Sequence, residues 1–103
     1  MLIRSQDKTA LVKFENIVVN LKLPDSLNVI CWSWQDAQRS GGYFILGKYS
    51  TKEKAMKVLD MIQEAYSEYQ IMLNFSVSYL HEFKEKTDGF AIFQMPEDSE
   101  VEA

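Results

Sequence analysis

Apolar and polar residues alternate along much of the first half of the chain, with the period of two that is typical of β-strands. The apolar phase slips at Glu15 and Asn16. We expect a bulge or turn there, because a strand cannot change faces without a break. Pro24 ends the second strand, since proline donates no ladder hydrogen bond. The predicted strands cover residues 2–5, 10–23 with that break, 28–35 and 42–49.

The period changes to that of a helix after residue 50. Ser50 and Glu53 form a capping-box pattern, with Ser50 as the predicted N-cap. Apolar residues then recur at spacings of three and four, with lysines and acids between them, which predicts an amphipathic helix over about 51–70. The apolar stripe consists of Ala55, Leu59, Ile62, Tyr66 and Tyr69.

Residues 71–86 fit two patterns. Alternation from Ile71 to Tyr79 indicates a strand, whereas Leu73, Leu80 and Phe83 continue the helical stripe. We favour a helix, either continuous or kinked near Asn74, because glycine and proline are absent between residues 48 and 88. An unbroken helix over 51–86 would be ~54 Å long and would need a second chain to cover its far end.

The order of these elements predicts an α+β fold. An antiparallel sheet of four or five strands packs against one long C-terminal amphipathic helix, or two helices. A short strand at 90–93 could rejoin the sheet. Residues 1–96 form the single domain, and 97–103, with four acids, form a flexible solvated tail. The predicted core consists of Leu2, Val12, Phe14, Val19, Ile30, Trp32, Ile45, Leu59, Ile62, Tyr66 and Phe93.

Composition narrows the class of protein. The chain has 103 residues and a formal net charge of −4, so binding of nucleic acid through a wholly basic surface is not expected. A signal peptide and a membrane-spanning run are absent from the pattern, and the single cysteine cannot form an internal disulfide. These features predict a soluble cytoplasmic protein.

The residues offer little for catalysis. His81 is the only histidine, so neither a hydrolytic triad nor a site with several histidines can be built within one chain. Cys31 lies between two large apolar residues, where a buried inert thiol is expected. Acids on the predicted helix alternate with lysines, as on a solvated face. We therefore expect a protein with no enzymatic activity, no metal and no cofactor.

Aromatic residues carry the main functional signal, at 13% of the chain. Trp32 and Trp34 lie two apart in one strand, so both indoles point to the same face. On the face beneath the helix they would be core, which we favour; on the opposite face they would form a platform that needs a partner. The predicted ligand or partner surface combines aromatic and basic side chains from the strand half: Trp32, Trp34, Tyr43, Arg4, Arg39 and Lys48.

The second half carries more apolar surface than one thin sheet can cover. This excess predicts a homo-oligomer, most simply a two-fold dimer. Its expected interface consists of Tyr66, Tyr69, Leu73, Leu80 and Phe83.

Three segments, MLIRSQDKTALVKFENI, ILGKYSTKEKAMKVLDMIQEAY and FQMPEDSEVEA, together resemble short proteins of phages and prophages of Firmicutes-type bacteria. The resemblance implies a small accessory protein of a mobile element, which binds a host protein or a small nucleotide signal and could act against host defence. The alternative function is a nucleic-acid-associated regulator that uses a basic sheet face. A small enzyme relying on carboxylates is the third hypothesis.

Overall fold

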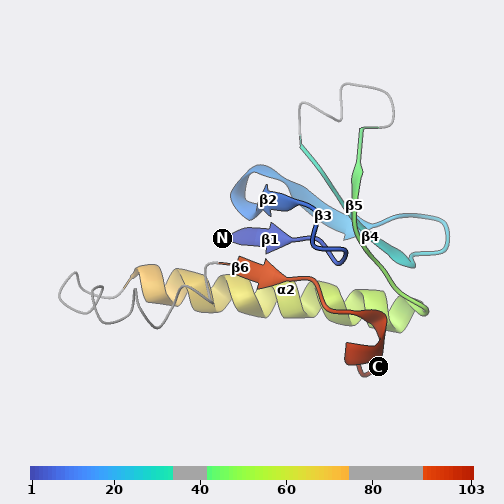
Figure 1. The fold of residues 1–103 in the computed structure, drawn as a ribbon. Helices are drawn as coiled ribbons and strands as arrows, with labels where there is room; N and C mark the ends of the chain where they lie inside the picture. The colour runs from blue at the N-terminus through green and yellow to red at the C-terminus, as the bar shows by residue number, and fades with distance from the viewer. Residues whose placement is uncertain (34–41, 75–91) are drawn as a thin grey trace.

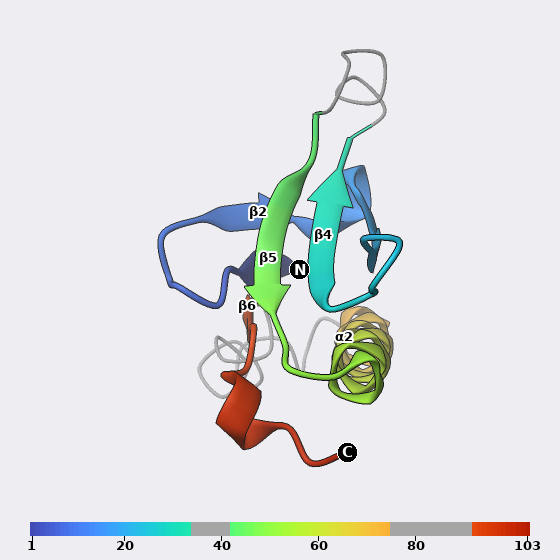
Figure 2. The same cartoon turned by 90° about the vertical axis from the view of Figure 1, so that its right-hand side faces the viewer.

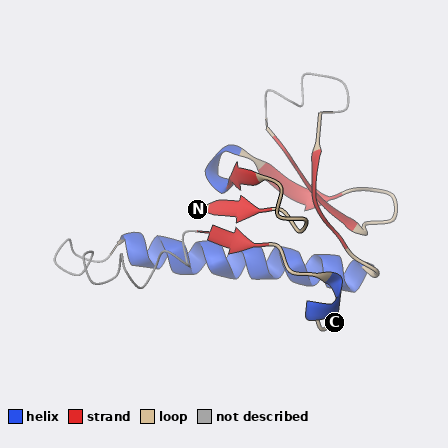
Figure 3. Ribbon diagram, viewed as in Figure 1, coloured by secondary structure: helices blue, strands red, loops and turns tan. Residues whose placement is uncertain are grey.

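The fold is α+β, as predicted, and is described from a computed structural model over residues 1–33, 42–74 and 92–103. Within these ranges, six short strands pack with one long helix (Figures 1 and 3). None of the described helices is long and apolar enough to cross a membrane. The elements are β1 (Leu2–Arg4), β2 (Leu11–Lys13), η1 (Phe14–Asn16), β3 (Val18–Leu21), β4 (Asn28–Trp32), β5 (Phe44–Lys48), α2 (Lys52–Leu73), β6 (Ile92–Gln94) and η2 (Asp98–Glu100).

The described strands form two three-stranded sheets, not the single sheet of four or five strands that the pattern predicts. The first sheet has the order β2-β1-β6, with β1 antiparallel to β2 and parallel to β6. The second has the order β3-β4-β5 and is antiparallel throughout. The phase slip at Glu15 and Asn16 explains the difference. The predicted break is the 3₁₀ turn η1, and it sends β2 and β3 to different partners.

Gln6 connects the two sheets just after β1. Its backbone N–H donates to the Leu46 carbonyl at 2.8 Å. Its side-chain Oε1 accepts from the Lys48 N–H at 2.9 Å, while Nε2 donates to the carbonyls of Lys48 and Pro96, both at 3.1 Å. The Gln6 side chain thereby provides hydrogen-bond partners for the N–H and carbonyl of Lys48 in β5 and for the carbonyl of Pro96 near the C-terminus.

The helix begins one residue later than predicted, because Thr51 and not Ser50 is its N-cap. The Thr51 hydroxyl accepts from the Lys54 N–H at 3.1 Å, as an N-cap should. The Ser50 N–H is used elsewhere, donating to Asp98 Oδ1 at 2.7 Å. At its other end the helix continues to Leu73, with Asn74 as its C-cap, and residues 75–86 of the ambiguous stretch lie outside the described residues.

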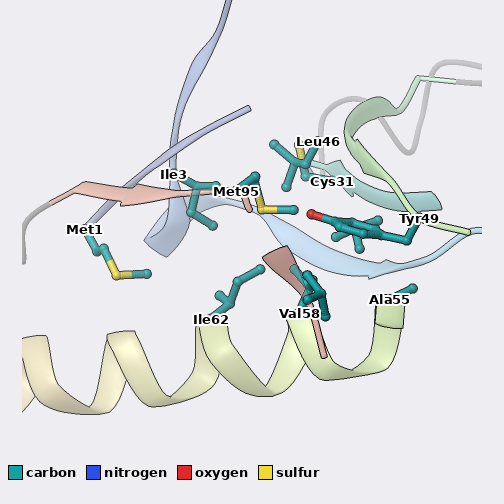
Figure 4. Packing of buried hydrophobic residues seen from close by; sticks show 11 residues of the cluster. Met1, Ile3, Cys31, Leu46, Tyr49, Ala55, Val58, Ile62 and Met95 are labelled. Atoms are coloured by element: carbon teal, nitrogen blue, oxygen red, sulfur yellow. The ribbon is translucent and has the colours of Figure 1, made fainter. Parts of the chain in front are cut away.

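The core lies between the helix and the two sheets (Figure 4). Ala55, Val58 and Ile62 point from one side of α2 toward the strands. The first sheet and the segment after it contribute Met1, Ile3 and Met95, and the second sheet contributes Val29, Cys31 and Leu46. Tyr49 lies at the end of the cluster nearest Ala55, and its hydroxyl donates to the Pro96 carbonyl at 2.8 Å. Burial raises the pKa of Tyr49, so this hydroxyl stays a donor at all ordinary pH values.

The C-terminal residues do not form the solvated tail that their acidity predicted. Val101 is only 4% exposed and belongs to the core cluster. Asp98 binds the start of the helix through Ser50 N–H and through the Lys54 ammonium, whose nitrogen lies 3.4 Å from Oδ2. The hydrogen bond from Ser50 is the main reason that the pKa of Asp98 lies below its ordinary value. A carboxylate at a helix N-terminus is stabilising, which explains why an acidic segment docks there.

We expect Gly47→Ala to destabilise the fold by about 1–3 kcal/mol, because the added methyl group has no room. A Cβ at this position would lie 2.9 Å from the Tyr49 hydroxyl oxygen and 3.0 Å from its Cε2. Chemical unfolding of the single variant gives the cost. The same substitution in a Tyr49→Leu background should cost clearly less, and an equal cost in both backgrounds would contradict this explanation.

Asp7 should make the stability of the 5–9 turn depend on pH. Its Oδ1 accepts from the Thr9 hydroxyl, the Ser5 hydroxyl and the Thr9 N–H, which lowers the pKa of Asp7 from 3.8 to about 2. A depressed carboxyl pKa adds stability that is complete above 3.8 and is lost as the pH falls toward 2. Urea unfolding across this window should show a smaller loss for Asp7→Asn than for the wild type. Parallel curves would refute the assignment.

Candidate functional site

The two faces of β4 have different roles. Val29 and Cys31 point into the core, so Asn28, Ile30 and Trp32 point to the other side. This placement corrects the favoured interpretation of Trp32 and Ile30 as members of the core beneath the helix. Trp32 is half-buried and lies on the opposite face, and Ile30, although only 7% exposed, is not part of the core cluster.

We call this surface of β3-β4-β5 the outer face. Two side-chain contacts across it confirm the assignment. Trp32 Nε1 donates to Asn20 Oδ1 at 3.3 Å, and the Lys22 ammonium donates to the Tyr43 hydroxyl. No described element lies in front of β4 and β5 on this side (Figure 2). From the strand register, its residues are Val18, Asn20, Lys22, Asn28, Ile30, Trp32, Tyr43, Ile45 and Lys48.

The outer face has an aromatic end and a basic character. Continuing the register of Cys31 with Phe44 places Tyr43 beside Trp32 on the neighbouring strand. The Lys22 nitrogen lies 4.6 Å from the centroid of the Tyr43 ring, within the range of a cation–π contact. Lys48 lies opposite Asn28 at the other end. Neither lysine is in an ion pair with a described carboxylate, and none of the nine outer-face residues is acidic.

The structure brings together half of the predicted ligand surface. Trp32, Tyr43 and Lys48 share the outer face. Arg4 does not join them, because it belongs to β1 in the first sheet, where its guanidinium donates to the Lys8 carbonyl at 3.3 Å. Trp34 and Arg39 lie outside the described residues.

Lys22 is the site residue that sequence reasoning missed. The pattern contained the necessary signal. Val19 and Leu21 are the inward positions of β3, so Asn20 and Lys22 must share the outward side. What the pattern could not supply was the distance that the Lys22 side chain spans across the sheet to reach Tyr43.

A second candidate is a largely apolar groove where α2 meets the corner between β2 and β3. It has a volume of about 430 Å³, and its main lining residues are Phe14, Val19, Leu59, Ile62 and Tyr66. The rings of Phe14 and Tyr66 pack with centroids 4.7 Å apart. Gln63 and Ser67 add two polar side chains to the lining, which contains no charged residue. The groove can therefore accept mainly apolar groups, and it offers no charge that would select an ionic ligand.

The predicted oligomer interface is partly covered by the chain itself. Tyr66 and Tyr69 are half-buried and pack against the edge of the core. Leu73, at the end of α2, is 52% exposed. Leu80 and Phe83 lie outside the described residues. The dimer stays a prediction, and a light-scattering mass of two chains is the expected result.

The described residues contain no group of three or more histidine, cysteine, aspartate or glutamate side chains arranged to hold a metal ion. The Cys31 thiol is buried in the core, 3% exposed, where a substrate could not reach it without unfolding. His81 lies outside the described residues. What the described part of the chain offers to a ligand is therefore surface and charge.

Comparison with known proteins finds no relative of this chain: no family model, no curated protein and no solved structure matches it.

Proposed function

We propose that this chain is a non-enzymatic binding protein. It uses the outer face to bind a component of a bacterial host cell and thereby sequesters or blocks that component. The observation that supports this most is the placement of Trp32, Tyr43, Lys22 and Lys48 on one face that no described element covers. Aromatic side chains bury much area with little loss of conformational freedom, and lysines select for anionic partners.

The resemblance to phage and prophage proteins supplies the setting of this proposal. A small accessory protein needs no catalytic residues if it acts by sequestering its target, because binding alone then removes the target from use. Counter-defence is one such role. The groove beside Tyr66 is the weaker candidate for the site, since its lining is mostly apolar and offers no charge to select a partner.

The test is a comparison of what immobilised proteins retain from host lysate, with both proteins and small molecules identified by mass spectrometry. The bait variants are Trp32→Ala combined with Tyr43→Ala for the outer face, and Leu59→Ala for the groove. We expect a component that the wild type and the groove variant retain and the outer-face variant loses. Retention that depends only on Leu59 would contradict the proposal.

A further inference from the structure

We infer that the outer face binds single-stranded nucleic acid, with a base stacked on Trp32 and phosphates at Lys22 and Lys48. This inference rests on the proposed use of the outer face and names the ligand class. Surfaces that bind single strands without an enclosed pocket combine exposed aromatic rings, on which bases stack, with cations that follow the backbone. The outer face provides both the aromatic rings and the cations, on the surface of a β-sheet.

The stacking position is fixed by its neighbours. Trp32 is half-buried, and its Nε1–H is already bound to Asn20, so the indole is held in place on the sheet before a ligand arrives. Tyr43 beside it is 41% exposed and is held by its contact with Lys22. Side chains that are held in the binding conformation lose little entropy on binding, which favours affinity from a small contact area.

The distance along the sheet from Trp32 to Lys48 favours a strand over a free mononucleotide. Lys22 lies opposite Asn28, whose carbonyl accepts from the Lys22 N–H at 3.0 Å, and its ammonium reaches across the outer face to the Tyr43 hydroxyl, where it can meet a phosphate. Lys48 lies opposite Asn28, four residues along β4 from Trp32, which is about 13 Å at roughly 3.3 Å per residue. One nucleotide does not engage both ends of that span, whereas linked nucleotides do.

The charge of the outer face is opposite in sign to that of the chain. The whole protein carries a net charge of −4, yet the outer face has two lysines and no acid. Such a local cationic patch attracts phosphates at short range, while the remaining acids disfavour the wide contacts that duplex DNA makes. The expected footprint is therefore short, with about two phosphates neutralised.

The test uses fluorescence anisotropy with a labelled single-stranded DNA of about eight nucleotides. A duplex of the same length and adenosine monophosphate are the competitors. Binding should weaken with salt at a slope of about −1.4 in log K against log [salt], which corresponds to about −0.7 for each of two phosphates. The single strand should compete far better than the duplex or the mononucleotide.

Three variants separate stacking from charge. Trp32→Ala should weaken binding roughly tenfold to a hundredfold with the salt slope unchanged. Lys22→Gln and Lys48→Gln should each reduce the slope by about 0.7. Lys57→Gln, the same charge change at an exposed helix position, is the matched control and should leave both affinity and slope at wild-type values. Thermal unfolding of each variant verifies that it is folded.

Two results would overturn the inference. One is absence of strand binding at low salt, and the other is equally tight binding of the mononucleotide or the duplex. If the strand does not bind but a lysate component is still lost with Trp32 and Tyr43, the proposed function stands and only the ligand class is wrong. If neither the binding of the single strand nor the retention of a lysate component depends on Trp32 and Tyr43, both proposals fail.

Discussion

Leu46→Ala should lower the free energy of unfolding by about 2–5 kcal/mol, because it deletes a side chain from the closed core and leaves a cavity. Leu46 is 1% exposed and lies in the cluster formed by the helix and both sheets. Its neighbour Ile45 points to the outer face, paired with Ile30, and is half-buried. Ile45→Ala should therefore cost only about 1 kcal/mol.

These two neighbouring residues form a matched pair, since each loses a similar number of methyl and methylene groups. Urea unfolding monitored by circular dichroism measures both costs. Equal costs, or a larger cost for Ile45→Ala, would mean that the faces of β5 are assigned the wrong way round. The outer face would then be the core, and the proposed site would disappear with it.

Truncation of the chain after Pro96 should destabilise it by about 3 kcal/mol. Most of this loss comes from Val101, whose buried side chain contributes about 1.5–3 kcal/mol. The remainder comes from Asp98, whose bonds to Ser50 and Lys54 hold the start of the helix.

A shorter truncation after Val101 is the control, because Glu102 and Ala103 are exposed and should contribute nothing measurable. Thermal and chemical unfolding of the two truncated chains give the comparison. A chain ending at Pro96 that is as stable as the full chain would show that the last residues are a solvated tail after all.

The sequence predicted where the strands and the helix lie along the chain better than it predicted which side of each strand is buried. The strands, the helix beginning near residue 51 and the break at Glu15 all follow from periodicity. The inward side of β4 does not, because Val29, Ile30, Cys31 and Trp32 are all apolar and alternation cannot separate them.

The same ambiguity affects the neighbouring strands. In β1, Leu2 was expected inside, but Ile3 is the core residue; in β5, Ile45 was expected inside, but Leu46 is. What decides the face is long-range packing. Tyr49 lies over Gly47 on the inner side, and that close approach fixes which residues of β5 meet the helix.

Charge was a misleading guide at the C-terminus. Four acids in seven residues indicate a solvated segment, and a single valine among them carries little weight in any pattern. The helix N-terminus supplies the missing partner for Asp98, and the core has a space for Val101. Neither could be known before the helix had been placed relative to the strands.

The most direct test of the outer face as the binding surface is methyl and indole NMR of the folded chain during titration with single-stranded DNA. We expect the Trp32 indole N–H and the methyl groups of Ile30 and Ile45 to shift. The methyl groups of Val29 and Leu46, on adjacent residues of the same strands, should stay in place. Shifts confined to Leu59, Ile62 and the groove, or no shifts at a concentration where binding is saturated, would contradict the account.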